Sequence, residues 1–115
     1  MLFRSKLVGS ARARELFFTA DRVDATTCEQ LGIVNRVVPA DRLMDETLAL
    51  ARRLAAGPTL AYGAVKSLLN GTFDQTLESQ MELEARAIAE LSVTADGQEG
   101  INAFMAKRKP EFRGA

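Results

Sequence analysis

The fold of this chain is decided by residues 94–112, TADGQEGINAFMAKRKPEF, which hold the signals for one complete helix. We expect Asp96 to cap its start, because Glu99 follows three residues later and completes a capping box. The apolar residues then recur at helical spacing and share one face. They are Ile101, Phe104 and Met105. This stretch therefore predicts an amphipathic helix near the end of the chain.

Positive charge is concentrated at the end of that helix. Lys107, Arg108 and Lys109 fall in its expected last turn, and Pro110 is expected to stop it because proline lacks an N–H. One interpretation is that the cations complement the helix dipole on a solvated end. The other is a basic arm directed at a phosphorylated ligand, with Phe104 one turn earlier available to lie against an aromatic base. The helix physics alone favours the first interpretation.

The rest of the chain is mostly helical in pattern. The predicted helices run from Ser10 as a cap to about Thr19, over residues 25–31 after Asp24, from Asp41 to Gly57-Pro58, over residues 59–69, and from about Phe73 to Ser92. Residues 33–38, IVNRVV, form the only β-branched run, and we expect one short strand or extended segment there. A lone strand has no partner in this chain, so it must pair elsewhere or lie extended along helices. The fold class is therefore mainly α.

Composition excludes several classes of function. Fifteen basic and fifteen acidic residues balance in 115, so no overall charge attracts the chain to nucleic acid or a membrane surface. Without histidine, neither a Ser-His-Asp triad nor a histidine zinc site is possible. The single cysteine, Cys28, cannot form an internal disulfide and fits a reducing cytoplasm. We therefore expect a cytoplasmic protein with no metal, no membrane span and no nucleic-acid partner.

Several polar side chains have both a functional and a plain structural interpretation. Glu78, Glu82 and Glu84 lie within two turns, but exposed acids on an amphipathic helix are the usual case. Lys66 could bind phosphate, although a lysine extending from a helix packed below it is commoner. Tyr62 could donate to an oxyanion, but a partly buried ring with a hydrated hydroxyl is the expected arrangement. None of these residues is a candidate catalytic group.

Three stretches in register carry a family resemblance. The first is Thr94-x-Asp96-x-x-Glu99-Gly100-x-x-Ala103-Phe104-x-x-Lys107-Arg108-x-Pro110-x-Phe112. The second is Leu7-Val8-Gly9 with Ala13-x-Glu15-Leu16, continuing to residues 31–39, and the third is Gly57-Pro58-Thr59 with residues 65–70. Together they resemble the C-terminal part of the enoyl-CoA hydratase/isomerase (crotonase) superfamily.

The resemblance implies an architecture and a binding site. Residues 1–32 would be the helical end of the crotonase core, and residues 33–115 a helical region that builds a trimer, often doubled to a hexamer. In such enzymes the C-terminal helix reaches a coenzyme A site, commonly that of a neighbouring subunit. Phe104 and Lys107 match the aromatic and the lysine that touch the adenosine phosphate end, and Arg108 and Lys109 match less well. Coenzyme A would be part of the substrate, so no separate cofactor is expected.

The resemblance also implies what this chain does not hold. The family's oxyanion hole and catalytic carboxylates lie upstream of the point where Leu7-Val8-Gly9 begins, and no Gly-Gly pair occurs here. We therefore expect the C-terminal fragment of a lyase or isomerase that hydrates acyl-CoA or moves its double bond in fatty acid metabolism, inactive alone. The alternative is a non-catalytic helical oligomerisation or protein-interaction module. A small adaptor that uses the acidic helix is a third possibility, with salt-sensitive binding to a basic partner.

Overall fold

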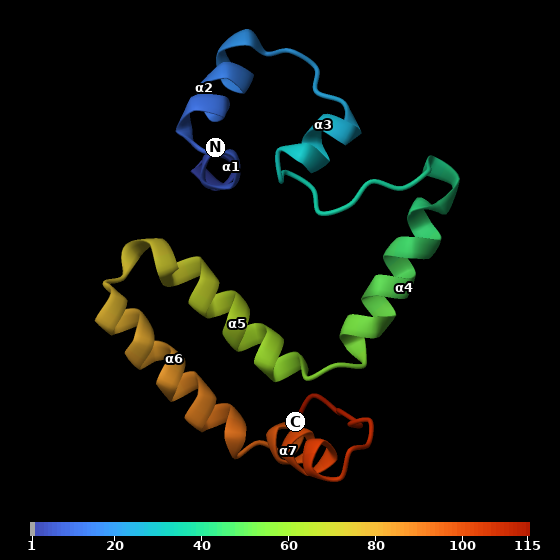
Figure 1. The fold of residues 1–115 in the computed structure, drawn as a ribbon, viewed down its shortest axis with the longest axis vertical. Helices are drawn as coiled ribbons and strands as arrows, with labels where there is room; N and C mark the ends of the chain where they lie inside the picture. Colours follow the sequence, from blue (N-terminus) through green and yellow to red (C-terminus); the bar gives the residue numbers. More distant parts are fainter. Residues whose placement is uncertain (1) are drawn as a thin grey trace. The chain divides into compact units, whose positions relative to one another are not determined.

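The computed structural model describes residues 2–115 and is built from helices (Figure 1). It divides into two compact units, Met1–Glu46 and Thr47–Ala115, which are described separately. The expected division at residues 32 and 33 concerns the core of a complete crotonase, and it stays a prediction. Within residues 2–115 there is no strand, so the mainly α fold class is confirmed.

The first unit holds α1 (Leu2–Val8), α2 (Ser10–Thr19), α3 (Ala25–Gln30), the short 3-10 helix η1 (Ala40–Arg42) and the start of α4 (Leu43–Ala55). Helices α1 and α2 pack against each other, and Ala13 is the buried residue of α2. Leu16 and Phe17, which the sequence places inward, line a pocket of about 360 Å³, although Phe17 remains 38% exposed. Cys28 is half-buried and lines the same pocket.

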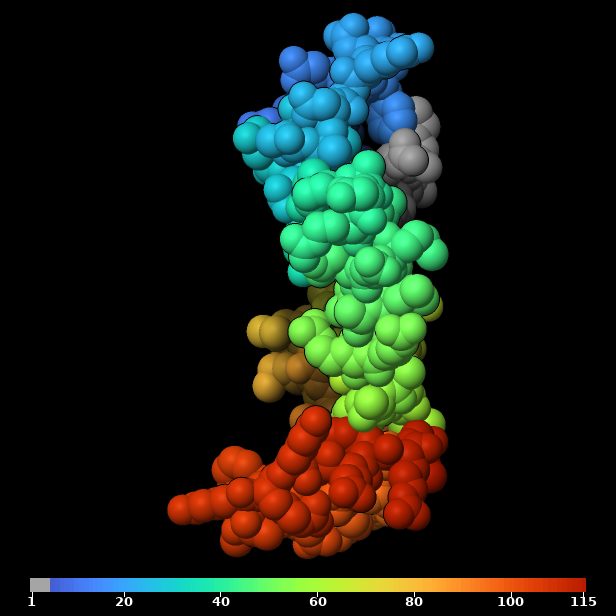
Figure 2. Space-filling model, turned by 90° about the vertical axis from the view of Figure 1, so that its right-hand side faces the viewer, coloured from blue at the N-terminus to red at the C-terminus, as the bar shows by residue number. Residues whose placement is uncertain are grey.

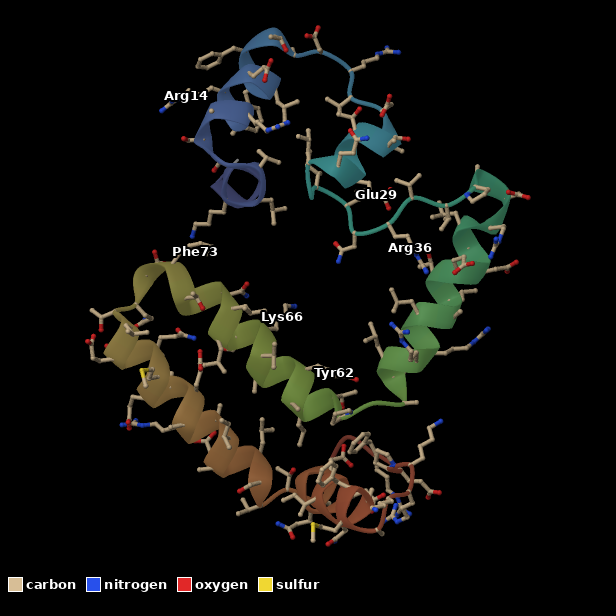
Figure 3. All side chains as sticks on the ribbon, viewed as in Figure 1. Arg14, Glu29, Arg36, Tyr62, Lys66 and Phe73 are labelled. Atoms are coloured by element: carbon tan, nitrogen blue, oxygen red, sulfur yellow. The ribbon has the colours of Figure 1, made fainter. Side chains whose placement is uncertain are left out.

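The β-branched segment forms no strand within the described residues. Turns and bends occupy residues 31–35, and residues 36–39 have no regular structure. The Val37 N–H donates to Glu29 Oε1 at 2.9 Å. Arg36 reaches the Glu46 carboxylate at the start of α4, with 3.2 Å between Nη2 and Oε2 (Figure 3). One side chain, Glu29, therefore bonds to the backbone of this segment, and a second contact joins its Arg36 side chain to α4.

The second unit holds the rest of α4, then α5 (Thr59–Gly71), the 3-10 helix η2 (Thr72–Asp74), α6 (Leu77–Ser92) and α7 (Ala95–Met105). Helices α5 and α6 lie side by side as a helical hairpin, and α7 contacts α6 (Figure 1). Large apolar side chains of α5 and α6 stay exposed. They are Leu60, Val65, Leu69, Leu77, Met81, Leu83 and Ile88.

Several helix ends differ from their predicted positions. Gly9, and not Ser10, precedes α2, and Asp41 lies inside η1 instead of capping α4. Helix α6 begins at Leu77, four residues later than predicted, because the Thr76 hydroxyl accepts the Ser79 N–H and caps it.

The predicted cap of α3 is confirmed, as Asp24 Oδ1 accepts the Thr27 N–H at 2.7 Å. The hydrogen bond from the Thr27 backbone, and then one from the Thr27 side chain, lower the pKa of the Asp24 carboxyl. Helix α5 starts at Thr59 as predicted but continues to Gly71, beyond the predicted end at residue 69.

Large apolar side chains stay exposed in both units, including Phe18 at 82% and Leu77 at 71%. Exposed apolar surface of this kind is typical of helices that pack against further protein. No helix among the described residues is long and apolar enough to cross a membrane.

Candidate functional site

The start of α7 is fixed by Thr94, which takes the capping role predicted for Asp96. The Gly97 N–H donates to Thr94 Oγ1 at 3.0 Å, and Thr94 Oγ1 itself donates to the Leu91 carbonyl at 2.7 Å. A Cβ at Gly97 would collide with that carbonyl oxygen, so only glycine fits between the ends of α6 and α7. The sequence prediction was wrong by two residues, because threonine and aspartate both make good caps.

Asp96 instead holds the end of the chain. Its side chain is 4% exposed and accepts the N–H groups of Arg113 at 2.7 Å and Gly114 at 2.8 Å. The Asp96 N–H donates to the Ala115 main-chain oxygen at 2.8 Å. The carboxylate and the backbone N–H of Asp96 together thus tie residues 113–115 to the first turn of α7. We call residues 106–115 the C-terminal hook.

Glu99 holds the middle of the hook. Arg108 donates through both Nη atoms to the two carboxylate oxygens, at 2.6 and 2.7 Å, and the Glu111 N–H donates to Oε1 at 2.8 Å. The hydrogen bonds from Arg108, and then that from Glu111, lower the pKa of Glu99 to about 2. The same pairing raises the pKa of Arg108. Glu99 therefore pairs with the hook and does not complete the predicted capping box.

Helix α7 ends earlier than its sequence suggests. Its last residue is Met105, so the three cations lie just beyond the helix and not in its last turn, and Pro110 does not stop it. The Lys107 N–H donates to the Phe104 carbonyl at 3.1 Å and the Arg108 N–H to the Ala103 carbonyl at 3.0 Å. This pattern is a Schellman motif, with Lys107 at the position that is usually glycine.

Lys107 is consequently in the left-handed region, with φ of 52°. This conformation costs a residue that carries a Cβ about 1–2 kcal/mol. Strain of this kind persists where surrounding contacts enforce it, and it is concentrated at functional sites. Among the described residues two that carry a Cβ have positive φ: Ala20, which ends α2, and Lys107, which is one of the two residues that the family resemblance assigns to ligand binding.

Both of those residues are open to solvent. Phe104 is 82% exposed, and Lys107 is exposed. No carboxylate among the described residues pairs with Lys107 or Lys109, whereas Arg108 is fully engaged by Glu99. Figure 2 shows α7 and the hook, in orange and red, with side chains extending into solvent. An exposed ammonium and an exposed aromatic ring are therefore three residues apart, one on α7 and one just beyond its end.

Tyr62 and Lys66, both on α5, do not join this site (Figure 3). Tyr62 is 42% exposed with its hydroxyl beside Gly57, and Lys66 is exposed. On α6, Glu82 pairs with Arg86 at 2.8 Å and Glu84 accepts from Gln80 at 2.9 Å. No group of acidic or cysteine side chains in residues 2–115 is arranged to hold a metal ion.

Comparison with known proteins gives the family. A family model described as enoyl-CoA hydratase/isomerase matches residues 1–115. The chain belongs to the enoyl-CoA hydratase/isomerase family. It is 35% identical to the 1,2-epoxyphenylacetyl-CoA isomerase of Escherichia coli K12, over 95% of this chain and 42% of that protein. It is 30% identical to the mitochondrial enoyl-CoA hydratase of Pongo abelii, over 95% of this chain and 38% of that protein.

A solved structure agrees with the family assignment. The enoyl-CoA hydratase subunit I of Geobacillus kaustophilus HTA426 matches with a TM-score of 0.91 and 43% identity, over 96% of this chain and 43% of that one. The chain therefore spans about two fifths of the length of the hydratases and isomerases that it matches. The predicted family, identified first from three stretches of residues, is confirmed.

Sequence reasoning missed the anchoring roles of Asp96 and Glu99 in this family member. Both were assigned to the helix start, where their charge is also favourable. The sequence does hold a signal for Glu99, because Arg108 follows nine residues later. A glutamate at this position can bond either to the backbone N–H at the helix start, as in a capping box, or to that arginine. The backbone N–H groups that Asp96 accepts leave no signal in the sequence, since any residue could supply them.

Proposed function

We propose that this chain is the coenzyme A-contacting and assembly region of an acyl-CoA hydratase or isomerase. Phe104 lies against the adenine, and Lys107 binds phosphate at the adenosine end of the ligand. The acyl-CoA thioester is the substrate of the complete protein, and coenzyme A enters as part of it. The supporting observation is an exposed ring with, three residues later, an unpaired lysine held in a strained, defined backbone conformation.

The reaction itself is proposed to depend on groups outside these residues. Hydration and double-bond migration both need two N–H donors for the thioester oxyanion and a carboxylate that moves a proton. We assign none of these roles to a residue of this chain, and we propose that it is inactive alone. Relatives named as a hydratase and as an isomerase match it almost equally well, so the proposal covers both reactions.

Assembly is the second part of the proposal. The exposed apolar faces of α4, α5 and α6 suit contacts with further protein, and a homotrimer or hexamer would cover them. Leu43 and Met44 of α4 are 55% and 65% exposed, and Leu77 and Ile88 of α6 are 71% and 69% exposed. Apolar surface of this extent is seldom left open to water.

The binding experiment is a titration of the 115-residue chain with coenzyme A, followed by calorimetry or NMR. Lys107→Ala is expected to weaken binding about fivefold or more, since it removes a charge-assisted contact to phosphate. Lys66→Ala is the matched control, because it removes one exposed lysine from α5. Equal affinity in both variants would contradict the assignment of Lys107.

Activity and assembly are tested on the same preparation. Light scattering is expected to give a trimer or hexamer, and crotonyl-CoA hydration is expected to be undetectable. Hydration by the pure chain would contradict the proposal that the catalytic groups are absent from it. A folded monomer would contradict the assembly role.

A non-catalytic oligomerisation module is the second candidate, favoured by the same apolar faces of α5 and α6. It predicts self-association with no measurable affinity for coenzyme A. The titration therefore separates the two candidates directly.

A further inference from the structure

The three cations just beyond α7 are chemically alike but structurally different. Arg108 uses both Nη atoms on the Glu99 carboxylate, and Nη1 also donates to the Lys109 carbonyl at 3.2 Å. Its charge is thereby neutralised and its direction fixed toward α7. Lys107 and Lys109 are exposed, and no carboxylate pairs with either among the described residues. A phosphate group near this turn would meet two available ammonium groups and one guanidinium that is already occupied.

The position of Arg108 explains how Lys107 keeps an unfavourable backbone conformation. Arg108 directly follows Lys107, and its own N–H closes the Schellman turn on the Ala103 carbonyl. Its side chain then reaches nine residues back to Glu99, which also accepts the Glu111 N–H. The backbone is thus held on both sides of Lys107, by α7 before it and by the Glu99 carboxylate after it.

From this geometry we propose that Glu99 and Arg108 are positioning residues for Lys107, and that Arg108 does not bind the ligand. The pair forms a clamp that fixes the turn from which the Lys107 side chain extends. Binding then requires ordering only the lysine side chain and not the ten-residue hook. This inference rests on the proposed contact between Lys107 and coenzyme A, and it adds the two residues that hold Lys107 in place for that contact.

The test compares coenzyme A with 3′-dephospho-coenzyme A, which lacks only the phosphate on the ribose. The dissociation constant for 3′-dephospho-coenzyme A is divided by that for coenzyme A, both measured on the 115-residue chain. This ratio reports the phosphate contact alone, and it is larger than one when the phosphate strengthens binding. Lys107→Ala is expected to bring this ratio close to one. If it leaves the ratio unchanged, the proposed contact fails, whatever the clamp variants show.

Arg108→Lys separates a positioning residue from a ligand. The variant keeps the positive charge but loses the fork that binds a carboxylate through two hydrogen bonds. If the pair is a clamp, Arg108→Lys should lower the ratio of dissociation constants by at least half as much as Lys107→Ala lowers it. A direct phosphate contact predicts a ratio close to that of the unaltered chain, since lysine also binds phosphate, and this result would overturn the inference.

Glu99→Gln and Glu111→Gln form the second, independent comparison. Each removes one negative charge close to Lys107, so simple electrostatics predicts equal or tighter binding of the phosphate in both. The clamp predicts that Glu99→Gln lowers the ratio while Glu111→Gln does not, because Glu111 bonds to Glu99 through its backbone N–H, which the substitution keeps, and its carboxylate makes only a charge interaction with Arg108. Equal ratios in the two variants would overturn the inference.

A structural readout accompanies both comparisons. Backbone chemical shifts of Lys107 report its left-handed conformation, those of residues 95–105 report α7, and circular dichroism reports the helix content of the whole chain. The clamp predicts that Arg108→Lys and Glu99→Gln shift the Lys107 signals toward averaged values with helix content retained. Unchanged Lys107 shifts in both variants would contradict a positioning role.

Discussion

Helices α3 and α7 end in the same hydrogen-bonded turn, but different residues occupy its left-handed position. At α3 the Ile33 N–H donates to the Cys28 carbonyl at 2.9 Å, and Gly32 has φ of 71°. At α7 the equivalent position is Lys107, with φ of 52°. Glycine adopts this conformation freely, and lysine does so only at a cost. The comparison of the two Schellman motifs therefore shows that α3 has the stable residue, glycine, at the left-handed position, whereas α7 has the less stable lysine.

The segments that follow the two turns differ in how many side-chain contacts hold them. After Gly32 one carboxylate, Glu29, accepts one backbone N–H, and Arg36 makes one hydrogen bond to Glu46 of α4. In the hook after Lys107, Glu99 and Asp96 together accept three backbone N–H groups and the Arg108 guanidinium. The strained turn is the more heavily tied one. The comparison indicates that the hook is held in place by polar contacts with α7, and that Lys107 depends on them.

The largest expected effect tests those contacts at their buried end. Asp96→Ala leaves the N–H groups of Arg113 and Gly114 without an acceptor, and hydrogen bonds to a charged group contribute about 1.5–3 kcal/mol. We expect the free energy of opening of the hook, measured by amide hydrogen exchange at Arg113 and Gly114, to fall by about 2–3 kcal/mol. Glu29→Ala removes one exposed contact and should cost the α3 end about 0.5–1 kcal/mol. Equal losses at the two ends would show that the hook is no more dependent on its carboxylates than the α3 end.

Gly32→Ala measures the conformational cost of the turn by itself. A Cβ at Gly32 meets no atom within 4 Å, so the expected loss of about 1–2 kcal/mol comes from the left-handed backbone alone. Gly63→Ala is the control, because Gly63 lies within α5 with open space around it and alanine is the better helix former. Chemical denaturation should show a loss in the first variant and a small gain in the second. A gain in both would mean that the turn at α3 tolerates a side chain.

The same two turns show what could be predicted from sequence. Gly32 was identified correctly as the end of its helix, because glycine carries its own preference for the left-handed region. The end of α7 was placed after Lys109 from Pro110, four residues too late. Nothing local marks Lys107 as a turn residue, since contacts with Glu99 impose its conformation. Phe104 and Lys107 were found as candidate binding residues through family resemblance, whereas helix periodicity alone places Phe104 on the apolar face and Lys107 at a solvated helix end.

Lys107→Gly separates stability from binding at the strained turn. Glycine relieves the left-handed strain, so the variant is expected to be more stable by about 0.5–1 kcal/mol. It also removes the proposed phosphate contact, so coenzyme A should bind at least as weakly as to Lys107→Ala. Denaturation and titration of one sample measure both. If stability does not increase, the left-handed backbone at Lys107 carries little strain relative to glycine, and the contrast with Gly32 disappears.

The response of the hook to acid tests a contact that the α3 turn lacks, an arginine held through two hydrogen bonds to a carboxylate of the helix that it follows. The hydrogen bonds from Arg108 and Glu111 lower the pKa of Glu99 to about 2, from an ordinary value of 4.5. A carboxyl group whose pKa is lowered by folding contributes its stabilisation above the unfolded pKa, and this is lost as pH falls through the folded one. The hook should therefore be unaffected from neutral pH down to about 4.5 and loosen between there and about 2. NMR titration of the Glu111 amide should show this transition in the unaltered chain and not in Glu99→Gln. A Glu99 carboxyl that titrates near its ordinary value would mean that Arg108 is not held to it in solution, and the left-handed Lys107 would then need another support.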